Sequence, residues 1–77
     1  MQKRFKIKRR LQTWEVLHNE ITVRRCQTKR EAIRVAVTLG RMQGRLGDDS
    51  EIVICDETGA LRLRRIIRAI GRASVAA

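Results

Sequence analysis

The middle of the chain carries the pattern of one amphipathic helix, and the segments on either side of it alternate with the period of β-strands. Thr28 and Glu31 have the spacing of a capping box, in which the threonine hydroxyl accepts a hydrogen bond from the third helical amide. Apolar residues then recur at helical spacing and need a surface to bury them. We expect this helix to begin at Lys29 and to end at Gly40 or, because Arg-Met-Gln favours helix, about one turn later at Gly44.

Five other segments read as strands, at residues 4–9, 13–18, 21–25, 51–55 and 60–64. In the first, Phe5 and Ile7 share one face while lysines occupy the other. Asn19 follows the second segment and favours a hairpin turn into the third. The run 51–55 is almost continuously apolar and predicts the most buried strand, and Gly59 after it suits a turn with positive φ.

The end of the chain fits two structures. Leu61 and Leu63 alternate with arginines, so we expect a strand whose leucines face inward, to about Arg65. Beyond it, residues 66–77 form either a tail that frays or a short amphipathic helix. Four apolar residues have the helical spacing i, i+3, i+4 and i+7 and are candidates for a partner-binding stripe, namely Leu63, Ile66, Ile67 and Ile70.

These elements predict an α+β fold, with a small antiparallel or mixed sheet of four to five strands packed on one main helix in the order β-β-β-α-β-β. The 77 residues leave room for a single domain, with a core at about residues 4–65. Cys26 and Cys55 are expected to be reduced, packed thiols, although a bridge between them is an alternative if their strands are neighbours.

Short motifs along residues 5 to 65 resemble those of a bacterial family known only as domain of unknown function 2188. The matching residues are Trp14-x-Val16, Thr28-x-x-Glu31-Ala32-Ile33, Ala36, Ile52-Val-Ile54, Asp56 and Gly59. The resemblance implies the same order of strands and helix. The family offers no catalytic or ligand-binding residue to carry over, so the resemblance implies nothing about activity.

The net charge of +10 is the strongest indication of function, because such a field attracts polyanions. The charge is segmental, since residues 46–60 contain five acidic and no basic residues. The helix arginines would form one stripe if the helix persists to Arg45, and arginine matches phosphate geometry. The candidate nucleic-acid-binding residues are Lys6, Lys8, Arg9, Arg10, Arg24, Arg25, Arg30, Arg34, Arg41, Arg45, Arg62 and Arg64.

Phosphate contact is favoured over base recognition, because Phe5 and Trp14 are the only aromatic residues and Trp14 is expected to anchor the core. The leading hypothesis is a nucleic-acid-associated protein that binds DNA or RNA phosphates. The alternative is a protein-interaction module or homodimer that uses the apolar stripe. An acidic protein partner or an anionic membrane surface would satisfy the same charge.

The pattern of titratable residues does not favour an enzyme. His18 is the only histidine, and no nucleophile or second catalytic group is spaced to act with it. We expect no cofactor and no metal, since the cysteines lack metal-ligand spacing and the acidic loop lacks that of a calcium site. The basic N-terminus has no apolar segment after it, and no apolar run approaches the length of a membrane span, so we expect a cytoplasmic protein.

Overall fold

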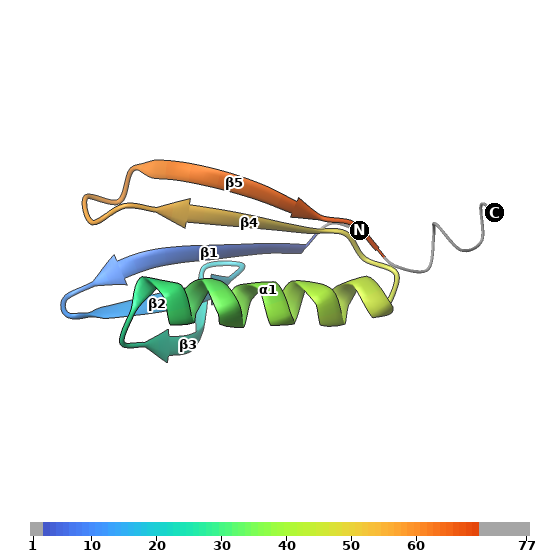
Figure 1. Ribbon diagram of the computed structural model, residues 1–77, viewed down its shortest axis with the longest axis horizontal. Coiled ribbons are helices and arrows are strands. Elements are labelled where there is room, and N and C mark those ends of the chain that lie inside the picture. The colour runs from blue at the N-terminus through green and yellow to red at the C-terminus, as the bar shows by residue number, and fades with distance from the viewer. Residues whose placement is uncertain (1–2, 70–77) are drawn as a thin grey trace.

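A computed structural model describes residues 3–69 of the chain, and in it one helix lies against one face of a five-stranded mixed sheet (Figure 1). This confirms the α+β class and the order β-β-β-α-β-β. The elements are β1 (Lys3–Arg10), β2 (Thr13–His18), β3 (Ile21–Cys26), α1 (Lys29–Arg45), β4 (Ser50–Cys55) and β5 (Leu61–Ile67). The helix α1 is not long and apolar enough to cross a membrane.

The strand order is β3-β2-β1-β4-β5, so the first strand of the chain lies at the centre. β1 pairs antiparallel with β2 and parallel with β4, whereas β3 and β5 form the two edges. Asn19 and Glu20 both have positive φ, at 53° and 67°, as a type I′ turn requires, and this turn joins β2 to β3 as predicted. Gly59 has φ 90° in the turn between β4 and β5, which also confirms the prediction.

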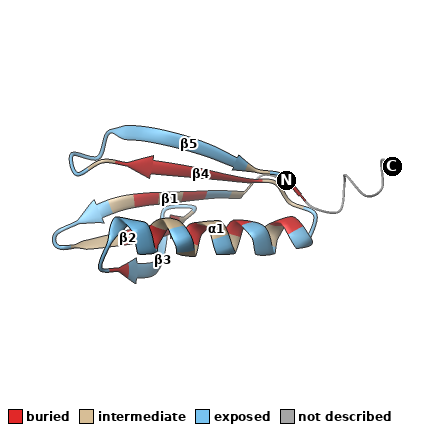
Figure 2. Ribbon diagram, viewed as in Figure 1, coloured by how far each residue is buried: buried red, intermediate tan, exposed pale blue. Residues whose placement is uncertain are grey.

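The core lies between α1 and the sheet face that it covers (Figure 2). The strand residues at the centre of this face are apolar and fully buried, as for Ile7 and Val16, which are register partners on β1 and β2. The buried helix residues recur every fourth position and are all small, so the helix backbone lies close to the sheet. They are Ala32, Ala36, Gly40 and Gly44.

The helix begins where predicted, because the Thr28 hydroxyl accepts a hydrogen bond from the Glu31 amide at 3.1 Å. Its predicted end at Gly40 or Gly44 is wrong, since both glycines are buried inside a helix that continues to Arg45. The end is set by Gly47, whose φ of 92° reverses the chain so that its amide donates to the Gly44 carbonyl at 3.1 Å. With the Asp48 amide donating to the Gln43 carbonyl at 3.0 Å, this is a Schellman motif, and its glycine lies three residues after Gly44.

β5 differs from its prediction in two ways. The strand continues to Ile67, where we expected it to stop near Arg65. A bulge between Ile54 and Cys55 shifts its register, so Leu61 pairs with Cys55 while Leu63 pairs with Ile54. The two leucines therefore do not both face inward: they are 59% and 55% exposed.

The proposed partner-binding stripe is consequently divided. Successive side chains of a strand point to opposite faces, so Leu63 and Ile67 lie on the side of α1 and Ile66 lies on the other side. Ile67 packs against the core beside Gly40. Ile70, and with it the choice between tail and C-terminal helix, lies outside the described residues.

The two cysteines are buried and free. Cys26 ends the edge strand β3 and belongs to the core under α1, where burial and the Glu31 charge raise the pKa of its thiol. Cys55 ends β4, which is separated from β3 by β1 and β2. The alternative of a Cys26–Cys55 bridge is therefore wrong, because it required neighbouring strands.

Candidate nucleic-acid interface

The sheet face opposite α1, called here the open face, collects basic side chains from three of the five strands, β1, β3 and β5. Phe5 and Ile7 point toward the helix, so the even-numbered residues of β1 point away from it. The register of the other strands extends this face on both sides of β1. Its charged members are Arg4, Lys6, Lys8, Arg10, Arg25 and Arg64, together with Glu15 and Glu51.

Each carboxylate of the open face is buried beneath arginine side chains. The Glu51 side chain is 2% exposed and lies between Arg4, whose Nε donates to Oε1 at 2.6 Å, and Arg64, whose Nε pairs with Oε2. Glu15 is paired with Arg25 in the same way, with Nε 3.2 Å from Oε2. The arginine side chains themselves are well exposed, since Arg4 keeps 64% of its side-chain surface and Arg64 keeps 63%.

The protonation state of Glu51 follows from these contacts. Burial acts to raise its pKa, but the hydrogen bonds and positive charges of Arg4 and Arg64 outweigh burial, and the pKa lies below its ordinary value. Glu51 is therefore ionised at neutral pH, Arg4 is held by a charge-assisted hydrogen bond and Arg64 by an ion pair with the same carboxylate. Three strands are joined in this way, because Arg4 lies on β1, Glu51 on β4 and Arg64 on β5.

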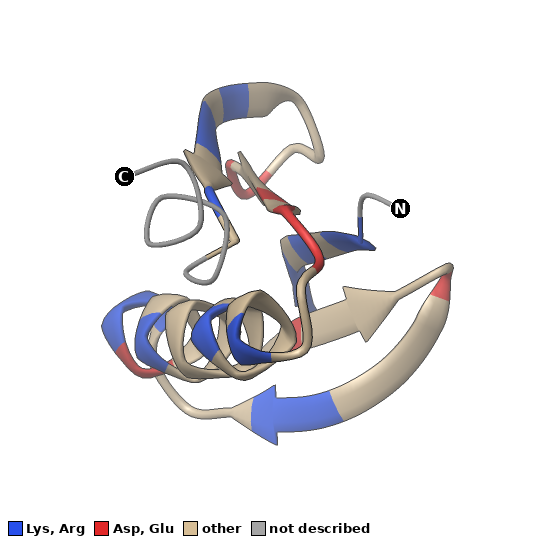
Figure 3. Ribbon diagram, turned by 90° about the vertical axis from the view of Figure 1, so that its right-hand side faces the viewer, with Lys and Arg blue, Asp and Glu red and all other residues tan. Residues whose placement is uncertain are grey.

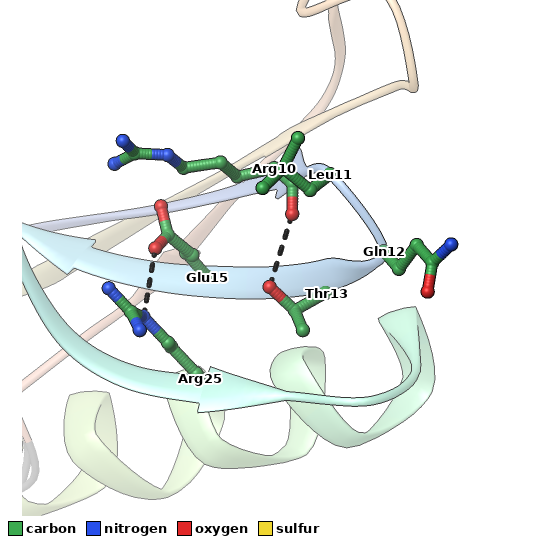
Figure 4. A pocket seen from close by; sticks show the side chains of 6 residues that line it. All are labelled: Arg10, Leu11, Gln12, Thr13, Glu15 and Arg25. Carbon is green, nitrogen blue, oxygen red and sulfur yellow. Dashed lines mark hydrogen bonds and ion pairs between the residues drawn. The ribbon is translucent and has the colours of Figure 1, made fainter.

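Three hollows lie along the open face. The largest, about 790 Å³, lies at the β1–β2 turn and is lined by Arg10, Leu11, Glu15 and Arg25 among others (Figure 4). A second, about 300 Å³, lies over β4 and is bordered by the arginines that hold Glu51. A third, about 370 Å³, adjoins it at Lys6. The face is thus uneven and basic, with room for groups that approach the arginines.

The helix arginines form the second basic surface, on the other side of the molecule (Figure 3). The helix does persist to Arg45, so its four exposed arginines share one stripe, as the spacing required. The small residues of α1 face the sheet, and the arginines face away from it. The structure therefore divides the predicted set, and this stripe, called here the helix stripe, comprises Arg30, Arg34, Arg41 and Arg45.

Three further candidates, Arg9, Arg24 and Arg62, belong to neither surface. Arg9 has the orientation of Phe5 and Ile7 on β1 and forms an ion pair with Glu57 at 2.9 Å. Arg24 lies opposite Val16, on the helix side of the edge strand β3. Alternation with Phe5 and Ile7 already placed Arg9 on this face, whereas the place of Arg24 depends on the register of β3 against β2.

Arg62 belongs to the turn between β4 and β5. Its Nε donates to Asp56 at 2.8 Å, and the same carboxylate accepts hydrogen bonds from the Thr58 amide and hydroxyl and from the Ala60 amide. The Thr58 hydroxyl, Arg62 and the two amides together hold the pKa of Asp56 well below its usual range. Arg62 therefore helps to fix this turn.

Arg4, Glu15 and Glu51 were missed as site residues. Arg4 was counted in the basic N-terminal segment, but nothing local distinguishes it from its neighbours. In the sequence Glu15 is one residue of a predicted strand, and Glu51 adjoins an acidic loop. Each carboxylate pairs with an arginine 10 to 47 residues away, and this pairing appears only in the folded sheet. A carboxylate within an otherwise apolar strand, as at Glu51, was the available signal.

His18 and Trp14 each contact a neighbouring ring or cation. The His18 ring stacks on Phe5 with centroids 5.0 Å apart. Trp14 packs against the core and has the Lys29 amine 5.7 Å from its ring centroid. Among residues 3–69, no three side chains of histidine, cysteine, aspartate or glutamate lie together as a metal site needs.

Comparison with known proteins gives no relative from which a role could be transferred: no family model, no curated protein and no solved structure matches the chain. The resemblance to domain of unknown function 2188 stays a prediction.

Proposed function

We propose that the protein binds nucleic acid through phosphate contacts made by the open face of its sheet. The observation that carries the proposal is the charge of that face, where six basic side chains are set against two buried carboxylates. No helix or strand within residues 3–69 covers it (Figure 1). The net charge of +10 provides long-range attraction to a polyanion.

Phosphates rather than bases are the groups that this surface suits. The face is built from arginine and lysine, which bind phosphate oxygens in any sequence context. Base stacking needs exposed aromatic rings, and the chain has only Phe5 and Trp14, which both pack on the helix side of the sheet. The proposal is therefore a sequence-tolerant binder, whose affinity falls steeply with salt.

Two matched double variants test which surface makes the contacts. Lys8 and Arg10 lie on the open face and have no ion-pair partner among residues 3–69, so Lys8→Gln/Arg10→Gln removes charge without breaking a described pair. Arg34→Gln/Arg41→Gln removes the same charge from the helix stripe. Affinity for a labelled 20-base-pair duplex and for a labelled single strand is measured by fluorescence anisotropy over a salt series.

The open-face variant should weaken binding and reduce the slope of log affinity against log salt by about 1 for each phosphate contact that is lost. The helix-stripe variant should lower affinity only through its smaller net charge. Failure of the wild-type protein to bind either probe at low salt would overturn the proposal. A larger loss in the helix-stripe variant would assign the contacts to α1 instead.

Partner binding near the C-terminus stays a prediction, but the candidate surface is now the edge of β5 instead of a continuous apolar stripe. β5 is an edge strand with an open backbone edge within the described sheet, so a partner could extend the sheet there. Arg62, Arg64 and Arg65 on this strand disfavour a second copy of the same chain. Sedimentation at increasing protein concentration tests the homodimer directly, and a concentration-independent monomer would exclude it.

A further inference from the structure

We propose that Arg4, Glu51 and Arg64 form a phosphate clamp, in which the buried carboxylate of Glu51 acts as a positioning residue. This inference rests on the proposed function and names the place on the open face where a phosphodiester group is held. The two guanidinium groups are the binding groups. Glu51 does not touch the ligand, but it fixes the separation and the orientation of the arginines.

The geometry of the ion pairs leaves the binding side of each arginine available. A guanidinium carries five N–H donors, and the described contacts to Glu51 use the Nε–H group of Arg4 and of Arg64. The terminal amino groups of both side chains have no described partner within residues 3–69. These groups are the donors that bind phosphate oxygens as a fork, and both side chains are more than half exposed.

The surroundings of the clamp suit an anion. A hollow of about 300 Å³ is lined by both arginines and by Lys6, which adds a third cation. The lining also includes Glu51, which is 2% exposed, so an arriving anion meets the guanidinium groups before the carboxylate. Val53 and Leu61 form apolar parts of the wall and do not compete for the arginine donors.

The carboxylate lowers the cost of binding by holding two long side chains in place. A free arginine loses rotamer freedom when it binds a ligand, at about 0.5 to 1.5 kcal/mol for each immobilised side chain. In this protein the Glu51 contacts restrict both side chains before the ligand arrives. Glu51 therefore helps an anion to bind although it carries a negative charge itself.

The test is whether removing the negative charge of Glu51 strengthens or weakens the binding of an anion. Glu51→Gln removes a negative charge from the open face, so simple attraction predicts tighter binding of a labelled 20-base-pair duplex. The clamp predicts weaker binding, by about three- to tenfold at 0.1 M salt, because glutamine cannot accept a charge-assisted bond from both arginines. The matched control is Glu20→Gln, which removes an exposed carboxylate paired with Lys6 at 3.2 Å and should bind at least as tightly as wild type.

A second variant keeps the test decisive if Glu51→Gln folds poorly. Arg64→Lys retains the charge and loses the planar fork, so the clamp again predicts a several-fold weaker affinity with an unchanged net charge. Circular dichroism and urea unfolding of each variant identify any loss that comes from the fold.

The outcomes separate the clamp from the proposed function. A wild-type protein that binds neither the duplex nor a single strand overturns both. A wild-type protein that binds, with Glu51→Gln as tight as Glu20→Gln or with Arg64→Lys as tight as wild type, overturns the clamp alone. Weaker binding by both a folded Glu51→Gln and a folded Arg64→Lys supports it.

Discussion

Replacing Arg4 and Arg64 together by methionine removes both partners of the Glu51 carboxylate and keeps apolar stems to cover it. Removing one side of a deeply buried ion pair costs about 3–5 kcal/mol. The Glu51 side chain is 2% exposed, but the two arginine side chains over it are themselves 64% and 63% exposed, so we expect the carboxylate to be partly hydrated in the variant. We therefore expect the free energy of unfolding at pH 7 to fall by about 2–3 kcal/mol.

The same prediction has a pH dependence whose sign is fixed by Glu51. Burial raises its pKa, the arginines lower it by more, and the net pKa lies below the ordinary 4.5. Such a group stabilises the fold above its unfolded-state pKa, and this contribution is lost as pH falls through the folded-state pKa. The difference between wild type and the double variant should therefore shrink as the pH falls below the ordinary pKa of 4.5 and through the lowered folded-state pKa of Glu51.

Urea unfolding followed by the fluorescence of Trp14, the only tryptophan, measures both effects. The matched control is Arg30→Met/Arg34→Met on α1, which removes the same charge from side chains with no described ion pair. Its stability should lie within about 0.5 kcal/mol of wild type, because exposed helix positions tolerate methionine. The reasoning would be refuted if Arg4→Met/Arg64→Met were as stable as this control at pH 7. It would also be refuted if the loss in its free energy of unfolding stayed unchanged at acid pH.

Three further predictions concern the fold. Thr28→Ala removes the hydroxyl that caps α1 and should cost about 1 kcal/mol in urea unfolding, whereas Thr28→Ser should cost little. Gly47→Ala places a side chain at φ 92° and should cost about 1–2 kcal/mol although no atom lies within 4 Å of the new Cβ, and an equal stability would contradict the Schellman end of the helix. Cys26 and Cys55 should remain two free thiols by mass spectrometry after mild oxidation of the folded protein, and a protein with an intramolecular disulfide would contradict the strand order.

The helix and the strands could be predicted because their patterns depend on residues that are close together in the sequence. The capping box at Thr28 and the alternation of Phe5 and Ile7 are each set by neighbouring residues, and the structure confirms both. The end of the helix failed because Gly40 and Gly44 serve close packing on the sheet, whereas Gly47 reverses the chain. A glycine in a sequence does not reveal which of these two roles it has.

The site depends on contacts between residues far apart in the chain, which no local pattern of the sequence reveals. The central position of β1 brings Arg4 beside Glu51, 47 residues away. The placement of α1 on one face separates the helix stripe from the lysines of β1, although both segments are basic in the sequence. A single bulge in the β4–β5 pairing puts Leu61 and Leu63 on opposite faces of the sheet, where alternation alone would have placed them together, and both are exposed on the edge strand.

The central claim is that phosphates meet the open face, and nuclear magnetic resonance tests it most directly. A ¹⁵N-labelled protein is titrated with an unlabelled 20-base-pair duplex while the arginine Nε–H and the backbone amide signals are followed. The account predicts that the Nε–H signals of Arg4 and Arg64 shift together with the amides of β1, while the Nε–H signals of Arg34 and Arg41 stay in place. Shifts confined to the helix arginines, or no shifts at low salt, would contradict it.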